Sequence, residues 1–114
     1  MADCIFCKII EGQIPTNKVY EDNDFLVFED VNPVAPTHLL MIPKKHIATF
    51  NDIRAEDAGL FGRLMLVAKN MAADKKLSSD GYRLVMNCLP GAGQSVYHIH
   101  FHLLGGRIFH WPPG

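Results

Sequence analysis

Five short segments, rich in apolar side chains and bounded by turn residues, are predicted to form β-strands. They are residues 18–21, 25–30, 37–43, 81–87 and 97–104. The polar residues at 22–24 suit a hairpin turn between the first two segments, and Pro43 stops the third. The β-branched, aromatic and aliphatic side chains of these segments favour strands over helices.

Two further segments carry apolar residues at helical spacing. Residues 55–76 predict one long helix, whose apolar stripe is Leu60, Leu64, Val67, Ala68 and Met71. Residues 4–11 predict a short helix ending at Gly12, because glycine suits a C-terminal cap. The order of elements predicts an α+β fold with a mostly antiparallel five-stranded sheet, as a single domain over residues 1–114.

Three of the six histidines occupy alternate positions of the last predicted strand. His98, His100, His102 and Leu104 share one face, and Tyr97, Ile99, Phe101 and Leu103 share the other. Neighbouring imidazoles on one face lie about 6.6 Å apart, so a flat strand brings at most an adjacent pair to one metal ion. Neutral imidazole is also a nucleophile and a proton carrier near pH 7. The pattern predicts nucleophilic or acid–base catalysis, or a metal site, and does not separate them.

The overall composition restricts the classes of partner. The chain has 114 residues, 48% of them hydrophobic and 20% charged, with a formal net charge of −1. Such a balance argues against broad binding to nucleic acid or to an anionic membrane, but not against a small nucleotide in a pocket. No apolar run approaches a membrane span, and the first residues do not resemble a signal peptide. We therefore expect a cytoplasmic protein.

The segment Asn-Cys-Leu-Pro-Gly-Ala-Gly-Gln-Ser at residues 87–95 leads into the histidines. Gly91 and Gly93 allow close backbone approach to a ligand, and successive N–H groups in such a turn cradle anions. Asn87 and Ser95 add an amide and a hydroxyl. Taken alone, the segment also reads as a plain connection between two strands. Beside three histidines, it indicates phosphoryl chemistry.

Cys4 and Cys7 form a Cys-x-x-Cys pair at the start of the short helix, which is half of a common zinc-site pattern. His46 and one of the three histidines can complete a Cys₂His₂ site. The alternative is two small, partly buried thiols. The third cysteine, Cys88, stands alone, and the odd count fits a reducing compartment better than a disulfide framework.

The run His-Ile-His-Phe-His-Leu-Leu at residues 98–104 matches the histidine-triad motif, in which three histidines alternate with hydrophobic residues. The chain resembles the histidine-triad (HIT) superfamily of nucleotide hydrolases and transferases, and within it the histidine triad nucleotide-binding (Hint) branch. The likeness includes IFCKII, VYED, PTHLLMIPKKHI, GYRLVMN, GQSVYHIHFHLLGGR and the terminal HWPPG. It implies a HIT-like fold and a homodimer that joins two five-stranded sheets.

The resemblance implies a purine nucleoside phosphoramidase, which cleaves the P–N bond of AMP-amine conjugates such as adenosine 5′-phosphoramidate and AMP-lysine. The middle histidine, His100, is the implied nucleophile and forms a nucleotidyl-histidine, with the His98 carbonyl as acceptor for its other nitrogen. No cofactor is required in this scheme. The implied catalytic residues are His98, His100, His102 and Ser95.

The resemblance also implies how the nucleotide is held, with Asp30 on the ribose and His38 behind the residues that touch the substrate. The implied nucleotide-binding set is Ile5, Phe6, Ile9, Phe28, Asp30, Val31, Asn87, Gly93, Gln94, Ser95, His100 and His102. Judged from the residues alone, Asp30 more simply caps a turn, and Phe6 and Phe28 are more simply core.

Two further features follow from the resemblance. Cys4, Cys7, His46 and His98 are the implied ligands of a structural zinc ion, since four protein ligands leave no open position. Trp111, the only tryptophan, is implied to reach the active site of the partner in the dimer, whereas the alternative is a tail packed on its own subunit.

Three other functions remain open from the sequence. One is a dinucleoside polyphosphate hydrolase or nucleotidylyl transferase of the same superfamily. Another is a metallohydrolase with His98 and His100 as ligands, and the third is a nucleotide-binding module with little turnover. The sequence does not encode the natural amine or the choice between adenine and guanine in a readable way.

Overall fold

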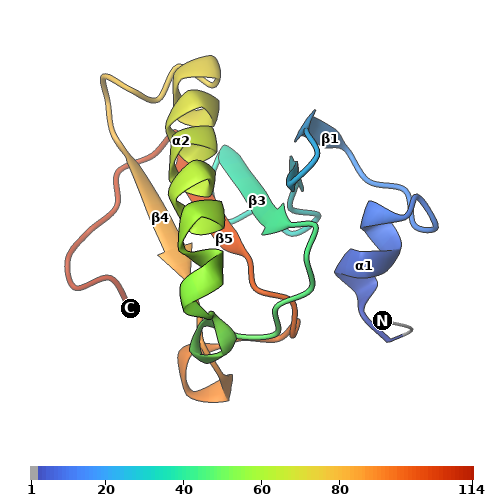
Figure 1. Ribbon diagram of the computed structural model, residues 1–114. Helices are drawn as coiled ribbons and strands as arrows, with labels where there is room; N and C mark the ends of the chain where they lie inside the picture. Colours follow the sequence, from blue (N-terminus) through green and yellow to red (C-terminus); the bar gives the residue numbers. More distant parts are fainter. Residues whose placement is uncertain (1–2) are drawn as a thin grey trace.

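The computed structural model describes residues 3–114 and consists of one five-stranded sheet with a helix on each face (Figure 1). The strands are β1 (Lys18–Glu21), β2 (Phe25–Glu29), β3 (Thr37–Pro43), β4 (Tyr82–Met86) and β5 (Phe101–Gly105), and the helices are α1 (Ile5–Ile10) and α2 (Ala58–Asp74). The strand order is β1-β2-β3-β5-β4, and every neighbouring pair is antiparallel. The predicted α+β class and five-stranded antiparallel sheet are confirmed.

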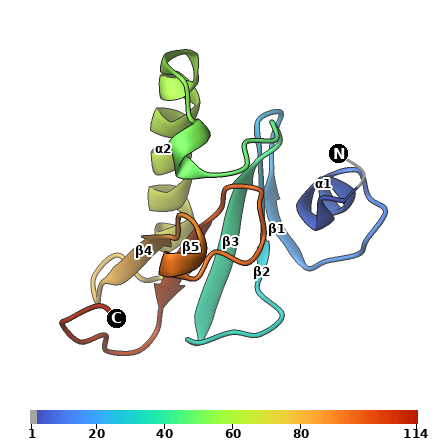
Figure 2. The ribbon, with the colours of Figure 1, turned by 90° about the horizontal axis from the view of Figure 1, so that it is seen from below.

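The two faces of the sheet bury different sets of side chains, because successive strand residues point to opposite sides. Phe25, Val27, Leu39, Met41 and Leu103 pack with α2 in the larger apolar cluster. On the other face, Leu26, Phe28, Leu40 and Ile42 pack with Phe6 and Ile9 of α1 in the smaller one. Figure 2 shows α2 and α1 on opposite sides of the sheet. Since His102 alternates with Leu103, the histidine points to the α1 side.

The predicted helices are present with adjusted ends. Cys4 caps α1, where its Sγ accepts a hydrogen bond from the Cys7 backbone N–H at 3.2 Å, and Gly12 follows the helix at φ +80°. A short 3₁₀ turn at Ala55–Asp57 precedes α2, so the regular helix begins later than predicted. The predicted stripe of α2 faces the sheet. Within residues 3–114, no helix has the length and apolarity needed to cross a membrane.

The start of the last predicted strand is wrong. The ladders of β5 with β3 and β4 begin at Phe101, which leaves His98 and His100 in the connecting segment before the strand. The physical reason is a change of partner: the Ile99 N–H donates to the Ile47 carbonyl at 2.7 Å, so the chain follows the loop after β3 instead of the sheet. Strand alternation therefore places His102, while other contacts place His98 and His100.

Candidate active site

The rings of His100 and His102 meet on the α1 face of the sheet, with centroids 5.2 Å apart. Phe6, projecting from α1, packs the edge of its ring against His100 at 5.1 Å and against His98 at 5.9 Å. His98 is fully buried and His100 is 8% exposed. The structure therefore gathers the three histidines under α1, although only His102 belongs to a regular strand.

His100 is held in one tautomer by its own chain. Its Nδ1 lies 2.8 Å from the backbone carbonyl of His98, the acceptor that the resemblance implied. A carbonyl only accepts, so the proton is on Nδ1 and the neutral ring keeps a free lone pair on Nε2. An imidazole in this state is ready to attack an electrophile without first losing a proton.

His102 is held in the opposite tautomer by a chain of two hydrogen bonds. The backbone N–H of Val34 donates to Nδ1 of His38 at 3.1 Å, so His38 carries its proton on Nε2. That nitrogen lies 2.8 Å from Nδ1 of His102 and 3.3 Å from Oδ2 of Asp30. With Nδ1 accepting, His102 carries its proton on Nε2 and presents a donor. The site thus combines a lone pair on His100 with an N–H on His102.

Burial favours the neutral forms of His102 and His38. It is the largest cause that lowers the pKa of His102 to about 4, and the neighbouring His100 and His38 lower it further, while Asp30 opposes the shift. Burial also lowers the pKa of His38, again against the attraction of Asp30. The hydrogen-bond chain therefore survives at neutral pH, because protonating either ring is unfavourable.

We expect the His102 ring in the folded protein to stay neutral well below pH 6.5, the pKa of an ordinary histidine. The unfolded chain then binds a proton that the folded chain does not, so the contribution of His102 to the free energy of unfolding falls as the pH drops from 6.5 to about 4 and changes no further below. The measurement is an NMR titration of the histidine ring carbons together with urea unfolding. A His102 resonance that titrates near pH 6.5 contradicts the prediction.

Asp30 caps a turn, and it also lies where a ligand could reach its carboxylate. Its Oδ1 accepts a hydrogen bond from the Asn32 N–H at 2.8 Å, which is the turn cap. Its other oxygen faces His38, and the residue lines two open hollows, of about 490 Å³ and 180 Å³. Val31, in the larger of the two, is 87% exposed. A ligand on this edge therefore meets a carboxylate that is already oriented.

The loop before the histidines is ordered by Gln94. Its side-chain Oε1 accepts from the Leu89 N–H, and its Nε2 donates to the carbonyls of Ala48 and Val96. The Gln94 backbone N–H also donates within the loop, to the Leu89 carbonyl. These contacts occupy the side-chain donors of Gln94 and hold the loop in shape, while the nucleotide contact that the resemblance implied for Gln94 stays a prediction. Gly93, at φ +93°, and the exposed Ser95 follow from that shape.

The side chains implied for the purine pocket divide into two groups. Phe6, Ile9 and Phe28 are buried in the smaller cluster, with Phe6 and Phe28 in an edge contact at 5.6 Å, so the core interpretation describes their packing. Ile5 is 46% exposed and lines an open hollow of about 440 Å³ together with His46 and Ser95.

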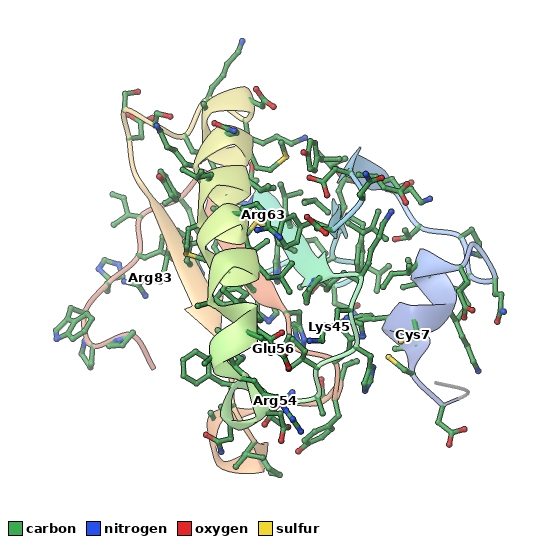
Figure 3. All side chains as sticks on the ribbon, in the orientation of Figure 1. Cys7, Lys45, Arg54, Glu56, Arg63 and Arg83 are labelled. Carbon is green, nitrogen blue, oxygen red and sulfur yellow. The ribbon has the colours of Figure 1, made fainter. Side chains whose placement is uncertain are left out.

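The four residues implied for zinc lie together. Cys7 projects from the side of α1 turned toward the rest of the molecule (Figure 3), and one donor atom from each of Cys4, Cys7, His46 and His98 lies within 4.8 Å of the others. Nδ1 of His98 is 3.3 Å from Cys4 Sγ, 3.6 Å from Cys7 Sγ and 3.2 Å from His46 Nδ1, and Cys7 Sγ is 3.4 Å from His46 Nδ1.

These separations fit a tetrahedral zinc ion. With Zn–S of about 2.3 Å and Zn–N of about 2.0–2.1 Å, adjacent S and N ligands are about 3.5 Å apart and two N ligands about 3.3 Å apart. The protonation state fits as well. Nε2 of His98 donates to the Pro43 carbonyl at 2.7 Å, so its single lone pair is on Nδ1, where three other groups crowd around it.

Burial sets the charge of this cluster in the absence of a cation. It lowers the pKa of His98 to about 4 and raises the pKa of the Cys7 thiol to about 11, a shift that the neighbouring Cys4 reinforces. The neutral His98 ring is the form that binds metals. A divalent cation would favour the thiolate of Cys7, since metal binding displaces the proton of a thiol.

Two groups that fix the site were missed in the sequence, the Pro43 carbonyl and the Val34 N–H. They set the tautomers of His98 and His38, but backbone groups carry no signal in the residue pattern.

The C-terminal segment is partly packed on its own chain, with Arg83 donating to the His110 carbonyl and Phe109 beside Arg107. Trp111 is nevertheless 82% exposed.

Comparison with known proteins agrees with this geometry. Residues 3–108 match the family described as "Scavenger mRNA decapping enzyme C-term binding". The purine nucleoside phosphoramidase of Escherichia coli K12 is 49% identical over 92% of this chain and 88% of its own. An uncharacterized HIT-like protein of Synechococcus elongatus is 52% identical over 98% and 97%. The crystal structure of a HIT family hydrolase from Legionella pneumophila superposes with a TM-score of 0.97 at 55% identity, covering 98% of this chain and all of that one. The chain belongs to the histidine triad (HIT) family.

Proposed function

We propose that the protein is a purine nucleoside phosphoramidase that hydrolyses the P–N bond of AMP-amine conjugates. The observation that carries the proposal is the pair of opposed tautomers, a lone pair on His100 Nε2 beside an N–H on His102 Nε2. A displacement at phosphorus needs a nucleophile and a donor for the phosphoryl oxygens, and this pair supplies both. The likeness to the E. coli phosphoramidase supports the choice of a P–N bond.

The proposed reaction has two steps. His100 Nε2 attacks the α-phosphorus, the P–N bond to the amine breaks, and the departing nitrogen takes a proton through Ser95 or His102. Water then attacks the nucleotidyl-His100, which releases AMP and returns the ring to its starting form. His98 holds the attacking ring through its carbonyl, and His38 keeps the donor proton on His102. Because a neutral imidazole attacks without losing a proton, the steps require no cofactor.

The nucleotide is proposed to lie across the α1 face. Asp30 would accept from the ribose hydroxyls beside Val31, and the purine would lie against Ile5 and the edges of Phe6, Ile9 and Phe28. Asn87, Gly93 and Ser95 would meet the phosphate, and Gln94 would hold their loop in shape. The orientation of Asp30 by Asn32 and the open hollows beside it support this arrangement.

The test is AMP release from adenosine 5′-phosphoramidate and AMP-lysine, compared with diadenosine polyphosphates, all with a chelator present. Faster cleavage of the phosphoramidates is the expected result. Preference for the polyphosphates would instead make the protein a dinucleoside polyphosphate hydrolase. Activity lost in chelator and restored by metal, with the fold intact, would favour a metallohydrolase using His98 and His100. Binding of AMP without any turnover would leave a nucleotide-binding module.

We also propose that Cys4, Cys7, His46 and His98 hold a structural zinc ion. The interatomic distances and the tautomer of His98 support it. When bound, zinc supplies a fixed tetrahedral link among its ligands and, with four protein ligands, no open position for chemistry. Its contribution would therefore be to hold α1 against the histidine segment, and its binding is measured in the experiment of the next subsection.

A homodimer is proposed as the active form. β4 is an edge of the described sheet, and it leaves Tyr82 and Leu84 about 40% exposed, an apolar strand edge of the kind that pairs with a second copy. The exposed Trp111 would then lie against the partner's site. Sedimentation of the full chain at micromolar concentration is expected to show a dimer, and Leu84→Lys is expected to shift it toward monomer. A wild-type monomer contradicts the proposal.

A further inference from the structure

Helix α1 takes part in both the cysteine–histidine cluster and the nucleotide face. Cys4 and Cys7, at its first turn, face His46 and His98, whereas Phe6 and Ile9 face the sheet and Ile5 remains exposed. An isolated helix of six residues is not stable in water, so its position depends on these side-chain contacts. Whatever fixes the two thiols therefore also fixes one wall of the expected purine site.

His98 provides a second connection between the same two places. Its ring contributes Nδ1 to the cluster, while its backbone carbonyl accepts the hydrogen bond from His100 Nδ1. The Phe6 ring lies against both rings, at 5.9 Å from His98 and 5.1 Å from His100. A ligand that restrains His98 and α1 together thus restrains the nucleophile and the pocket wall together.

We infer that metal binding at Cys4, Cys7, His46 and His98 is thermodynamically coupled to nucleotide binding on the α1 face. The inference rests on the proposed function, since it takes a purine nucleoside monophosphate as the ligand. In the metal-free protein, α1 is held in place only by its side-chain contacts, so the nucleotide has to restrain it further when it binds, and this cost weakens the affinity. With the metal bound, α1 is ordered beforehand, so the nucleotide binds more tightly. The coupling is reciprocal, so the nucleotide raises the metal affinity by the same factor.

The experiment measures both directions on the full-length protein. Calorimetry gives the Kd of AMP for protein stripped by a chelator and for the same protein reloaded with Zn²⁺. Co²⁺, whose absorption spectrum reports tetrahedral thiolate coordination, gives the metal affinity with and without AMP. AMP is expected to bind about fivefold or more tightly to the loaded protein, and Co²⁺ to bind more tightly by the same factor when AMP is present.

Matched cysteine variants separate the cluster from general effects of losing a thiol. Cys7→Ser removes a ligand and is expected to abolish the Co²⁺ spectrum and to give AMP the weak affinity of the stripped protein. Cys88→Ser changes a cysteine outside the cluster and is expected to keep the Co²⁺ spectrum and the Co²⁺ affinity of wild type. Circular dichroism checks that each form is folded. If stripped protein unfolds, Co²⁺ competition against a chelator with and without AMP still measures the coupling on loaded protein.

The outcomes distinguish the coupling from the proposed function. A full-length protein that binds no Zn²⁺ or Co²⁺ overturns the inference, as does a loaded site with AMP affinity equal to that of the stripped form. In the second case the phosphoramidase assay stands unaffected. Failure of AMP to bind in either form overturns the nucleotide function, and the coupling with it.

Discussion

Replacing His100 with alanine is expected to lower the rate of AMP release from adenosine 5′-phosphoramidate by about a thousandfold or more, since it removes the attacking atom itself. Only His100 pairs a protonated Nδ1, fixed by the His98 carbonyl, with a free Nε2. Mass spectrometry at alkaline pH, where a phosphorus–nitrogen bond is stable, is expected to detect a nucleotidyl adduct on the wild type and none on His100→Ala.

Two comparisons make this result specific. AMP binding to His100→Ala is expected to persist, because Asp30 and the loop at residues 87–95 remain. His110→Ala deletes an imidazole from the exposed tail, and only the backbone carbonyl of His110 accepts from Arg83, so activity near wild type is expected. A His100→Ala enzyme that keeps most of its activity would place the nucleophile elsewhere.

The largest expected loss of stability from adding one methyl group is at Gly106, directly after β5. The residue has φ +93°, and a Cβ built there would lie 2.8 Å from Cβ of Pro36, a ring that cannot turn aside. Backbone strain and the clash together are expected to lower the free energy of unfolding of Gly106→Ala by about 2–4 kcal/mol. A fall in the thermal midpoint on the order of 10 °C is the measurement that checks it.

Gly62→Ala is the matched control. Gly62 lies within α2, and a Cβ built there meets no atom within 4 Å. Alanine in an open helical position is expected to raise the free energy of unfolding by about 0.5–1 kcal/mol. A destabilised Gly62→Ala, or an unchanged Gly106→Ala, contradicts the account of these two positions.

The residue pattern was sufficient to predict the elements whose apolar side chains recur at a regular spacing along the chain. The apolar stripe of α2 predicted which of its side chains face the sheet, because burying them is the main driving force for this element. The same reasoning failed at His98 and His100. Their conformation depends on hydrogen bonds to Ile47, Pro43 and their own backbone, and no spacing of residues encodes those partners.

Some features of the site were also predictable from the sequence, and others were not. Cys4, Cys7, His46 and His98 were brought together by resemblance and are close in space, although 94 positions separate Cys4 from His98. The structure adds a role for Gln94 that the resemblance did not imply, because its amide links Leu89 to the Ala48 carbonyl and so orders the loop. The resemblance already implied the tautomer of His100 through the carbonyl of His98, whereas the tautomer of His102 became readable only when the N–H of Val34 was located.

The sheet also divides the molecule into two halves that evolution and engineering can treat separately. The larger apolar cluster, under α2, holds the fold together on one face, whereas the three triad histidines, Cys4, Cys7 and Asp30 gather toward the other. Substitutions on the α1 side that alter ligand preference leave the packing under α2 untouched. Substrate preference can therefore change through substitutions on the α1 side while the stability supplied by the α2 side is kept.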